Sequence, residues 1–328
     1  MKEFSKIKML FLAKCAPKEG ASPPEFHPTR GVVPQYHYEI YTVLKNLGFH
    51  LTSSDEISYL FNAKRKFDYV FSLYNRAPFR NSEVFVSSIC EYLKIPYLGS
   101  PPHIRCIAED KKLTKIVAQH LGIPASPGKV YRCCDKEITP PEFCGPYFVK
   151  PRFEAASKHI DDNSITQSWG ETKERIMFLL EQNLDVLLEQ FISGANVTLP
   201  IISLDSPKVF PCTNEISGVR GNIVTFRQNR LFEKNLKREI MADSELTSQI
   251  QNYGLKFYNY IQPVDYARFD FRVEANTNQP YLLECNICCN LGKHSTVSMG
   301  AKYLGMNQEE LIRTILINSF KRQNVFRQ

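Results

Sequence analysis

The stretch "YARFDFRVEANTNQPYLLECNICCN", residues 266–290, has the pattern of two strands joined by a short polar turn. Side chains alternate between the two faces of a strand, so Arg268 and Asp270 share one face and the intervening phenylalanines point to the other. The same rule places Glu284 and Asn286 together on the second strand. If the hairpin is symmetric about the threonine of its turn, Asp270 lies opposite Glu284 and Arg268 opposite Asn286. The hairpin therefore predicts one polar patch of four side chains.

Two directly opposed carboxylates repel, at a cost of up to about 1 kcal/mol, so this patch needs a compensating feature. A bound cation, exposure to solvent or a neutralising arginine would each supply one. Two carboxylates and an amide oxygen are hard donors that suit Mg²⁺ when it shares its shell with phosphate. A half-exposed strand, with phenylalanines inside and charges outside, also satisfies the alternation. Both interpretations stay open at this point.

The cysteines of the same stretch raise the alternative of a thiolate metal site. A structural zinc site needs two spaced pairs of ligands. Cys288 and Cys289 are adjacent, Cys285 points away from the carboxylate beside it, and the other adjacent pair, Cys133 and Cys134, is distant in sequence. Buried thiols are therefore the preferred interpretation. Cys288 and Cys289 begin the loop that follows the hairpin.

Length and composition indicate a globular protein of two or three lobes. The chain has 328 residues, 43% of them hydrophobic, and no apolar run approaches the roughly 20 residues of a membrane helix. The first 15 residues imitate a signal peptide, but Lys14 interrupts the apolar segment, which we interpret as a buried strand. Ten cysteines without a leader or regular spacing favour a reducing compartment. We expect a cytoplasmic protein without a membrane partner.

The net charge of +7 suits an anionic ligand, but it is spread along the chain. The densest basic stretch, residues 227–239, has the pattern of a solvated surface. A nucleic-acid-binding surface would need basic residues interleaved with exposed aromatics, or a known module, and neither is present. We expect no nucleic-acid partner.

Alternating strand and helix patterns favour the α/β class. Strands are expected at residues 8–13, 67–74, 147–151, 185–192 and 196–204, and helices at 36–49, 82–95, 108–124, 171–182, 246–260 and 308–320. Neither a P-loop nor a G-x-G-x-x-G motif is present, which argues against P-loop nucleotidases and Rossmann dehydrogenases. Two lysines occupy informative positions, since Lys150 ends a strand before Pro151 and Lys111 begins a helix after Asp110.

Taken in order, several segments resemble the ATP-grasp ligases, and among them the D-alanine:D-alanine ligase branch, over roughly residues 85–315. The similar segments are "EYLKIPYLGSPP", "AEDKKLTK" with "LGIPASPG", "YFVKPRFEAASKHI", "VLLEQFISGANV", "ARFDF" with "LLECN", and "GKHS" with "AKYLGMNQEELI". The resemblance implies an α/β ATP-grasp fold of three lobes. These would be an N-terminal α/β domain at 1–104, a central ATP-binding lobe at 105–194, and a C-terminal lobe at 195–328 that contains the metal hairpin.

The resemblance also implies an activity, an ATP-dependent joining of a carboxylate to an amine through an acyl phosphate. The cofactors would be ATP and two Mg²⁺ ions, the substrates small molecules such as amino acids, and the assembly a homodimer. By position, Lys111 and Lys150 would hold the phosphates. Glu189, with Gln190 and Phe191, would bind the adenine. Asn196, where the family has a Glu, would bind the ribose. Asp270, Glu284 and Asn286 would bind metal, Arg268 would face the oxyanion, Glu154 and Ser157 would act from a closing loop, and Ser295, Asn290, His294, Arg80 and Glu83 would contact substrate.

The sequence departs from the family pattern in the closing loop. Ala155 and Ala156 replace a Gly and a Ser, and His159 stands where a Gly is common. Together with the lost charge at Asn196, this change raises an alternative, a nucleotide-binding protein of the same fold that has lost catalysis.

The substrate end also departs from the pattern. An acidic family stretch is replaced by "PFRNSE", which offers only Arg80 and Glu83, and the N-terminal glutamate of the family has only Glu19 or Glu25 as counterparts. The loop that Cys288 begins should shape the pocket of the second substrate. We therefore expect a substrate pair other than two D-alanines.

Overall fold

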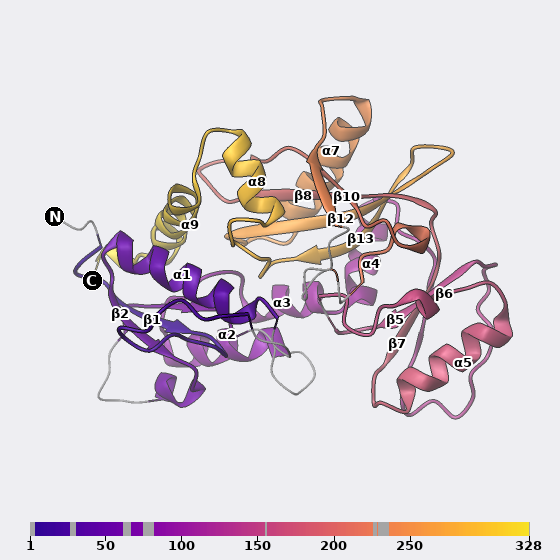
Figure 1. The fold of residues 1–328 in the computed structure, drawn as a ribbon, viewed down its shortest axis with the longest axis horizontal. Coiled ribbons are helices and arrows are strands. Elements are labelled where there is room, and N and C mark those ends of the chain that lie inside the picture. The colour runs from indigo at the N-terminus through magenta and orange to yellow at the C-terminus, as the bar shows by residue number, and fades with distance from the viewer. Residues whose placement is uncertain are drawn as a thin grey trace.

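A computed structural model describes residues 4–26, 31–61, 67–74, 82–154, 156–225, 228 and 236–327. The described chain forms three sheets in an elongated molecule, with the first sheet at one end, the second at the other and the third between them (Figure 1). No helix in these ranges is long and apolar enough to span a bilayer.

The first sheet is parallel and buried on both faces. Its order is β2 (His50–Ser54), β1 (Lys8–Leu12), β3 (Tyr69–Ser72). Met9 and Phe11 of β1 pack against α1 (Val33–Leu47) and α9 (Gln308–Gln323), whereas Leu10 and Leu12 pack against α2 (Ser82–Leu93). This two-sided burial explains the uninterrupted apolar run that resembled a signal peptide.

The second sheet is antiparallel and carries one helix. Its order is β4 (Gly128–Tyr131), β7 (Val186–Gln190), β5 (Tyr147–Pro151), β6 (Ile165–Thr166), and it packs on α5 (Trp169–Leu180). A capping box between Ser168 and Glu171 begins α5.

The third sheet is also antiparallel and has one apolar and one polar face. Its order is β11 (Lys237–Ile240), β10 (Thr213–Ile216), β8 (Gly194–Ile202), β12 (Tyr266–Glu274), β13 (Pro280–Asn286), with β9 (Lys208–Val209) beside β8. Leu199, Phe269 and Phe271 pack on α7 (Glu245–Tyr260). The alternate side chains of β8 and β12 therefore point away from α7, toward the second sheet.

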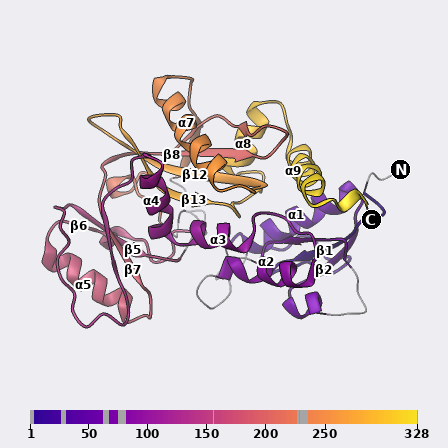
Figure 2. The same ribbon diagram turned by 180° about the vertical axis from the view of Figure 1, so that it is seen from behind.

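Helices α3 (Pro102–Glu109) and α4 (Lys111–His120) bridge the first sheet and the other two, as the view from behind shows (Figure 2). The sequence predicted a single helix here, but the chain turns at Asp110 between the two helices. Helix α8 (Thr296–Tyr303) precedes α9. The boundary predicted at residue 104 lies inside α3, and β8 begins at Gly194, one residue before the predicted start of the C-terminal lobe; the domain limits stay a prediction.

Candidate functional site

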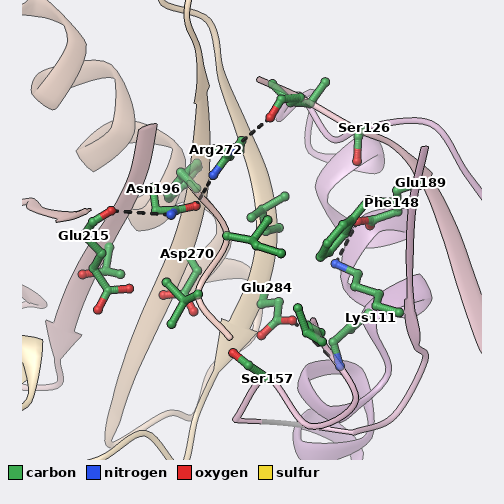
Figure 3. A pocket seen from close by; sticks show the side chains of 18 of the residues that line it. Lys111, Ser126, Phe148, Ser157, Glu189, Asn196, Glu215, Asp270, Arg272 and Glu284 are labelled. Atoms are coloured by element: carbon green, nitrogen blue, oxygen red, sulfur yellow. Dashed lines mark hydrogen bonds and ion pairs between the residues drawn. The ribbon is translucent and has the colours of Figure 1, made fainter. Parts of the chain in front are cut away.

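One pocket lies between the polar face of the third sheet and the edge of the second (Figure 3). Figure 3 shows Asp270, Arg272 and Asn196 on one side and Glu189 with Phe148 on the other, while Glu284 and Lys111 lie near Ser157. The predicted site residues that line it are Lys111, Lys150, Glu154, Ser157, Glu189, Gln190, Phe191, Asn196, Arg268, Asp270, Glu284 and Asn286. The structure therefore gathers twelve residues that are far apart in sequence.

The hairpin has the predicted register where it forms the pocket. Asp270 pairs with Glu284 and Arg268 with Asn286, as the symmetric hairpin predicts. A bulge between Asp270 and Phe271 then shifts the pairing by one residue toward the turn. Side-chain alternation did not predict this irregularity, but the bulge lies beyond Arg268, Asp270, Glu284 and Asn286 and leaves their patch intact.

The carboxylates of the patch are balanced by cations. Arg268 donates two hydrogen bonds to Asp270, from Nε to Oδ1 and from Nη2 to Oδ2, both at 2.7 Å. Asn286 Nδ2 donates to Asp270 Oδ2 at 2.9 Å, and Lys111 Nζ lies 3.8 Å from Glu284 Oε1. Arg268 thus offsets part of the repulsion between the opposed carboxylates of Asp270 and Glu284.

Burial shifts the ionisation of this patch. It raises the pKa of Asp270 to about 6, against the lowering effect of Arg268. Burial alone would lower the pKa of Arg268, but Asp270 outweighs it and the pKa lies above its ordinary value. Arg268 therefore stays charged.

Two buried lysines share the carboxylate of Glu189. Lys115 Nζ lies 2.6 Å from Oε1 and Lys150 Nζ lies 2.8 Å from Oε2, and each of the three side chains is at most 3% exposed. Burial lowers the pKa of Lys115, while the two lysines together outweigh burial and lower the pKa of Glu189. The triad places ammonium groups firmly at the edge of the pocket.

Lys115 was missed at the sequence level. It lies one helical turn after Lys111 on α4, and both side chains are buried while Leu113 and Ile116 of the expected apolar face are exposed. The spacing of four residues was the available signal.

The adenine contacts assigned to β7 stay a prediction. Both carboxylate oxygens of Glu189 already face ammonium groups. The N–H groups of Gln190 and Phe191 donate to the carbonyls of Pro127 and Pro146, at 3.0 and 2.8 Å.

The closing loop covers the pocket beside Lys111. Lys111 Nζ donates to the carbonyl of Glu154, and Lys158 Nζ lies 2.9 Å from Glu154 Oε1. Ser157 and His159 have positive φ angles of 57° and 62°. The family's glycine would adopt this backbone without strain, so the histidine is a costly replacement. Ala156 shares the conformation, and Ala155 lies outside the described residues.

The described residues that were predicted to contact substrate lie outside this pocket. Ser295 is the N-cap of α8 and its Oγ accepts from Ser298 N at 3.1 Å. Asn290 and His294 are exposed. Glu83 is buried at the start of α2, and its main-chain N–H donates to Glu109 Oε2 at 3.3 Å.

Two predicted features lie wholly or largely outside the described residues. Arg80 is one, and the other is the basic stretch 227–239, of which the structure describes only Gln228 and residues 236–239.

The three thiols of the opening stretch do not form a metal cluster. In the described ranges no three His, Cys, Asp or Glu side chains are grouped to hold an ion. Cys285 and Cys289 are buried, and Cys288 Sγ accepts from Arg105 Nη1 at 2.7 Å. The thiols therefore belong to packing around the loop.

Comparison with known proteins supplies the family. The family described as "D-ala D-ala ligase C-terminus" matches residues 130–317. A D-alanine–D-alanine ligase of Polaromonas sp. is 30% identical over 240 residues, 70% of this chain and 69% of that protein. One from Janthinobacterium sp. is 28% identical over 96% of this chain and 95% of its own. Among solved structures, the Bacillus anthracis D-alanine–D-alanine ligase complexed with ATP matches at a TM-score of 0.73 and 18% identity, covering 97% and 99% of the two chains, which shows the same fold.

Proposed function

Because the chain belongs to the D-alanine–D-alanine ligase family and is an ATP-dependent ligase that forms a carbon–nitrogen bond, we propose that its pocket phosphorylates a small carboxylate and passes the acyl group to an amine. The observation that supports this most is the patch of Arg268, Asp270, Glu284 and Asn286 facing two lysines across one pocket. The relatives do not support the alternative of a protein that has lost catalysis.

The residues present fit ATP with Mg²⁺. Lys111 and Lys150 would hold the phosphates, and the oxygens of Asp270, Glu284 and Asn286 are the hard donors that Mg²⁺ prefers. Thr198 strengthens the fit, since its buried Oγ1 has no hydrogen-bond partner among the described residues and Thr198 pairs with Asp270 across the sheet. Bound Mg²⁺ would neutralise phosphate charge during an in-line transfer.

The protein's own groups would perform the rest of the chemistry. A carboxylate is a poor electrophile, so activation as an acyl phosphate precedes attack by the amine. Arg268 would stabilise the negative charge of the tetrahedral oxyanion, a role typically worth about 3 kcal/mol of barrier. Glu154 and Ser157 would act from the closing loop, which excludes the water that would hydrolyse the acyl phosphate.

We propose amino acids as the substrates, and a pair other than two D-alanines. Ser295 would hold the carboxylate of the second substrate at the start of α8, where main-chain N–H groups favour an anion. Asn290 and His294 lie close in sequence and would shape this subsite, with Arg80 and Glu83 serving the first substrate. The departure at "PFRNSE" motivates a changed pair, and a homodimer is proposed from the family.

The test is a screen of paired amino acids with Mg-ATP, read by phosphate release and by mass spectrometry of the product. We expect ADP and phosphate only when both a carboxylate and an amine are supplied. Asp270→Ala and Glu284→Ala should lose at least about 100-fold in turnover, the scale of losing one electrostatic contact to the transition state. Full turnover in both variants would refute the site.

A further inference from the structure

Arg272 is a buried cation of the nucleotide pocket that the sequence prediction did not include. It lies two residues after Asp270 on β12, so it points to the same face, and it is 3% exposed. No carboxylate in the described part of the chain forms an ion pair with it. Burial lowers its pKa to about 10, so it remains charged at neutral pH.

The guanidinium is a clamp on one wall of the pocket. Nε donates to the carbonyl of Ile192 at 2.7 Å, Nη1 donates to the carbonyl of Asn222 at 3.0 Å, and Nη2 donates to the carbonyl of Gly221. It also lies 5.3 Å from the centre of the Phe191 ring. Arg272 of β12 thereby joins the segment that follows β7 to the segment 220–222.

Asn196 is fixed by the same clamp (Figure 3). Its Oδ1 accepts from Arg272 Nη1 at 2.6 Å, and its Nδ2 donates to the carbonyls of Asn222 and Glu215. An amide oxygen can accept two hydrogen bonds and an amide nitrogen can donate two, so Oδ1 keeps a protein donor and Nδ2 keeps protein acceptors whether or not a ligand is bound. Turning Asn196 toward a ligand would break the contact with Arg272.

The segment 220–222 is closely packed at Gly221. Gly221 has a φ of 67°, and a Cβ there would lie 2.5 Å from Ile165 and 2.8 Å from Phe191. The side chains of Ile165 and Phe191 therefore pack closely on Gly221, and the carbonyl of Gly221 accepts from Arg272.

Sequence position places the sugar beside this clamp. Two residues along a strand span about 7 Å, roughly the length of a ribose, and Asn196 is two residues from Thr198, which pairs with the metal-binding Asp270. A nucleotide with its phosphates at Asp270 would therefore pass its sugar along Asn196.

Resting on the ATP site proposed above, we propose that Arg272 withdraws Asn196 from the ligand, so the pocket reads the base and the phosphates but not the 2′-hydroxyl of the ribose. A site whose buried acceptor bonds a ligand hydroxyl rejects the analogue that lacks it, because the acceptor is left unpaired. Here the acceptor is already paired by Arg272. The pocket should therefore accept 2′-deoxynucleotides.

Calorimetry with Mg-ADP and Mg-2′-deoxy-ADP tests this on the full chain without knowledge of the amino-acid substrates. We expect the two dissociation constants to agree within threefold. Asn196→Ala should change both by the same factor, because the side chain would not touch the sugar. Arg272→Met, with its fold checked by circular dichroism, should free Asn196 and create a preference for ADP of more than threefold.

A wild-type preference for ADP above threefold, removed by Asn196→Ala, would overturn the proposal. If neither Mg-ADP nor Mg-2′-deoxy-ADP binds, both this proposal and the proposed ATP site are overturned. Equal binding of both nucleotides in a protein that ligates no substrate pair would support this inference while refuting the proposed function.

Discussion

Glu189 shows how a single residue positions two lysines beside the pocket. Its carboxylate lies between two ammonium groups, and removing one member of a buried ion pair leaves an uncompensated charge. We expect Glu189→Gln to lower the free energy of unfolding by roughly 3–5 kcal/mol, measured in urea. Glu174→Gln, the same change on the exposed face of α5, should have no measurable effect. Equal stability of the two variants would show that Lys115 and Lys150 do not depend on Glu189.

Strand alternation was sufficient to predict the four side chains of the hairpin patch, because a half-buried strand offers only two faces. The same rule extends to Arg272, whose placement on the pocket face was predictable although its partners were not. Those partners are residue 196 on β8, residue 192 after β7, and residues 221 and 222 in a short helical turn. Sequence periodicity carries no information about such distant contacts.

At the scale of an element, the start of α4 positions Lys111. Asp110 accepts from the N–H groups of Lys112 and Leu113, and it forms a two-point ion pair with Arg152 at 2.9 and 2.6 Å. It is both the N-cap of the helix and, through Arg152, a link to the end of β5, the strand that carries Lys150.

Substitution of Asp110 separates these two roles. Asp110→Ala removes the cap and the ion pair, and the loss of the cap alone should cost about 1 kcal/mol of stability. Asp110→Asn keeps a capping oxygen. We expect Asp110→Ala to weaken Mg-ATP binding by roughly tenfold, about 1.4 kcal/mol, and Asp110→Asn to weaken it less, measured by calorimetry. Identical affinities for the two variants would show that the cap does not position Lys111.

Helix α4 also shows where periodicity fails. Its apolar residues predicted an inward face, yet Leu113 and Ile116 are exposed and the buried face carries Lys111 and Lys115. Val117 and Leu121 of the predicted face do pack against the core, so the hydrophobic spacing located part of the buried face but not the two lysines on it.

At the scale of the whole molecule, Asp265 joins the first sheet region to the third sheet. It is 1% exposed and accepts from Gly99 N and Ser319 Oγ, both at 2.7 Å, and from Arg322 Nε and Nη2, both at 3.0 Å. The carboxylate thus ties β12 to α9 and to the segment that leads into α3. None of these contacts follows a local pattern, so the sequence did not predict them.

Loss of this junction should destabilise the protein as a whole. Asp265→Ala should lower the free energy of unfolding by about 3–5 kcal/mol, because Arg322 loses its buried partner. Limited proteolysis should then cut between the first sheet and α3 earlier than in wild type. Asp205→Ala is the control. Asp205 is exposed and lies 3.9 Å from Lys321 of α9, so its loss should change neither the free energy of unfolding nor the rate of proteolysis. A junction variant as stable as this control would contradict the assignment.

The overall architecture was predictable because motifs in a fixed order resembled a known family, and the shared fold bears out that expectation. The amino-acid end was not predictable to the same degree. Asn290, His294 and Ser295 lie in the segment between β13 and α8, Glu83 lies on α2, and all four are outside the pocket. Their common substrate depends on loops whose geometry no residue spacing dictates.

The central claim is that the carboxylate substrate is activated as an acyl phosphate within the Arg268–Asp270 pocket. The most direct measurement follows ¹⁸O from the labelled carboxylate of an accepted substrate during turnover with Mg-ATP and the amine. We predict that one ¹⁸O atom appears in the released phosphate for each amide bond formed, since the phosphate departs with a carboxylate oxygen. Unlabelled phosphate, or release of AMP and pyrophosphate, would contradict the account.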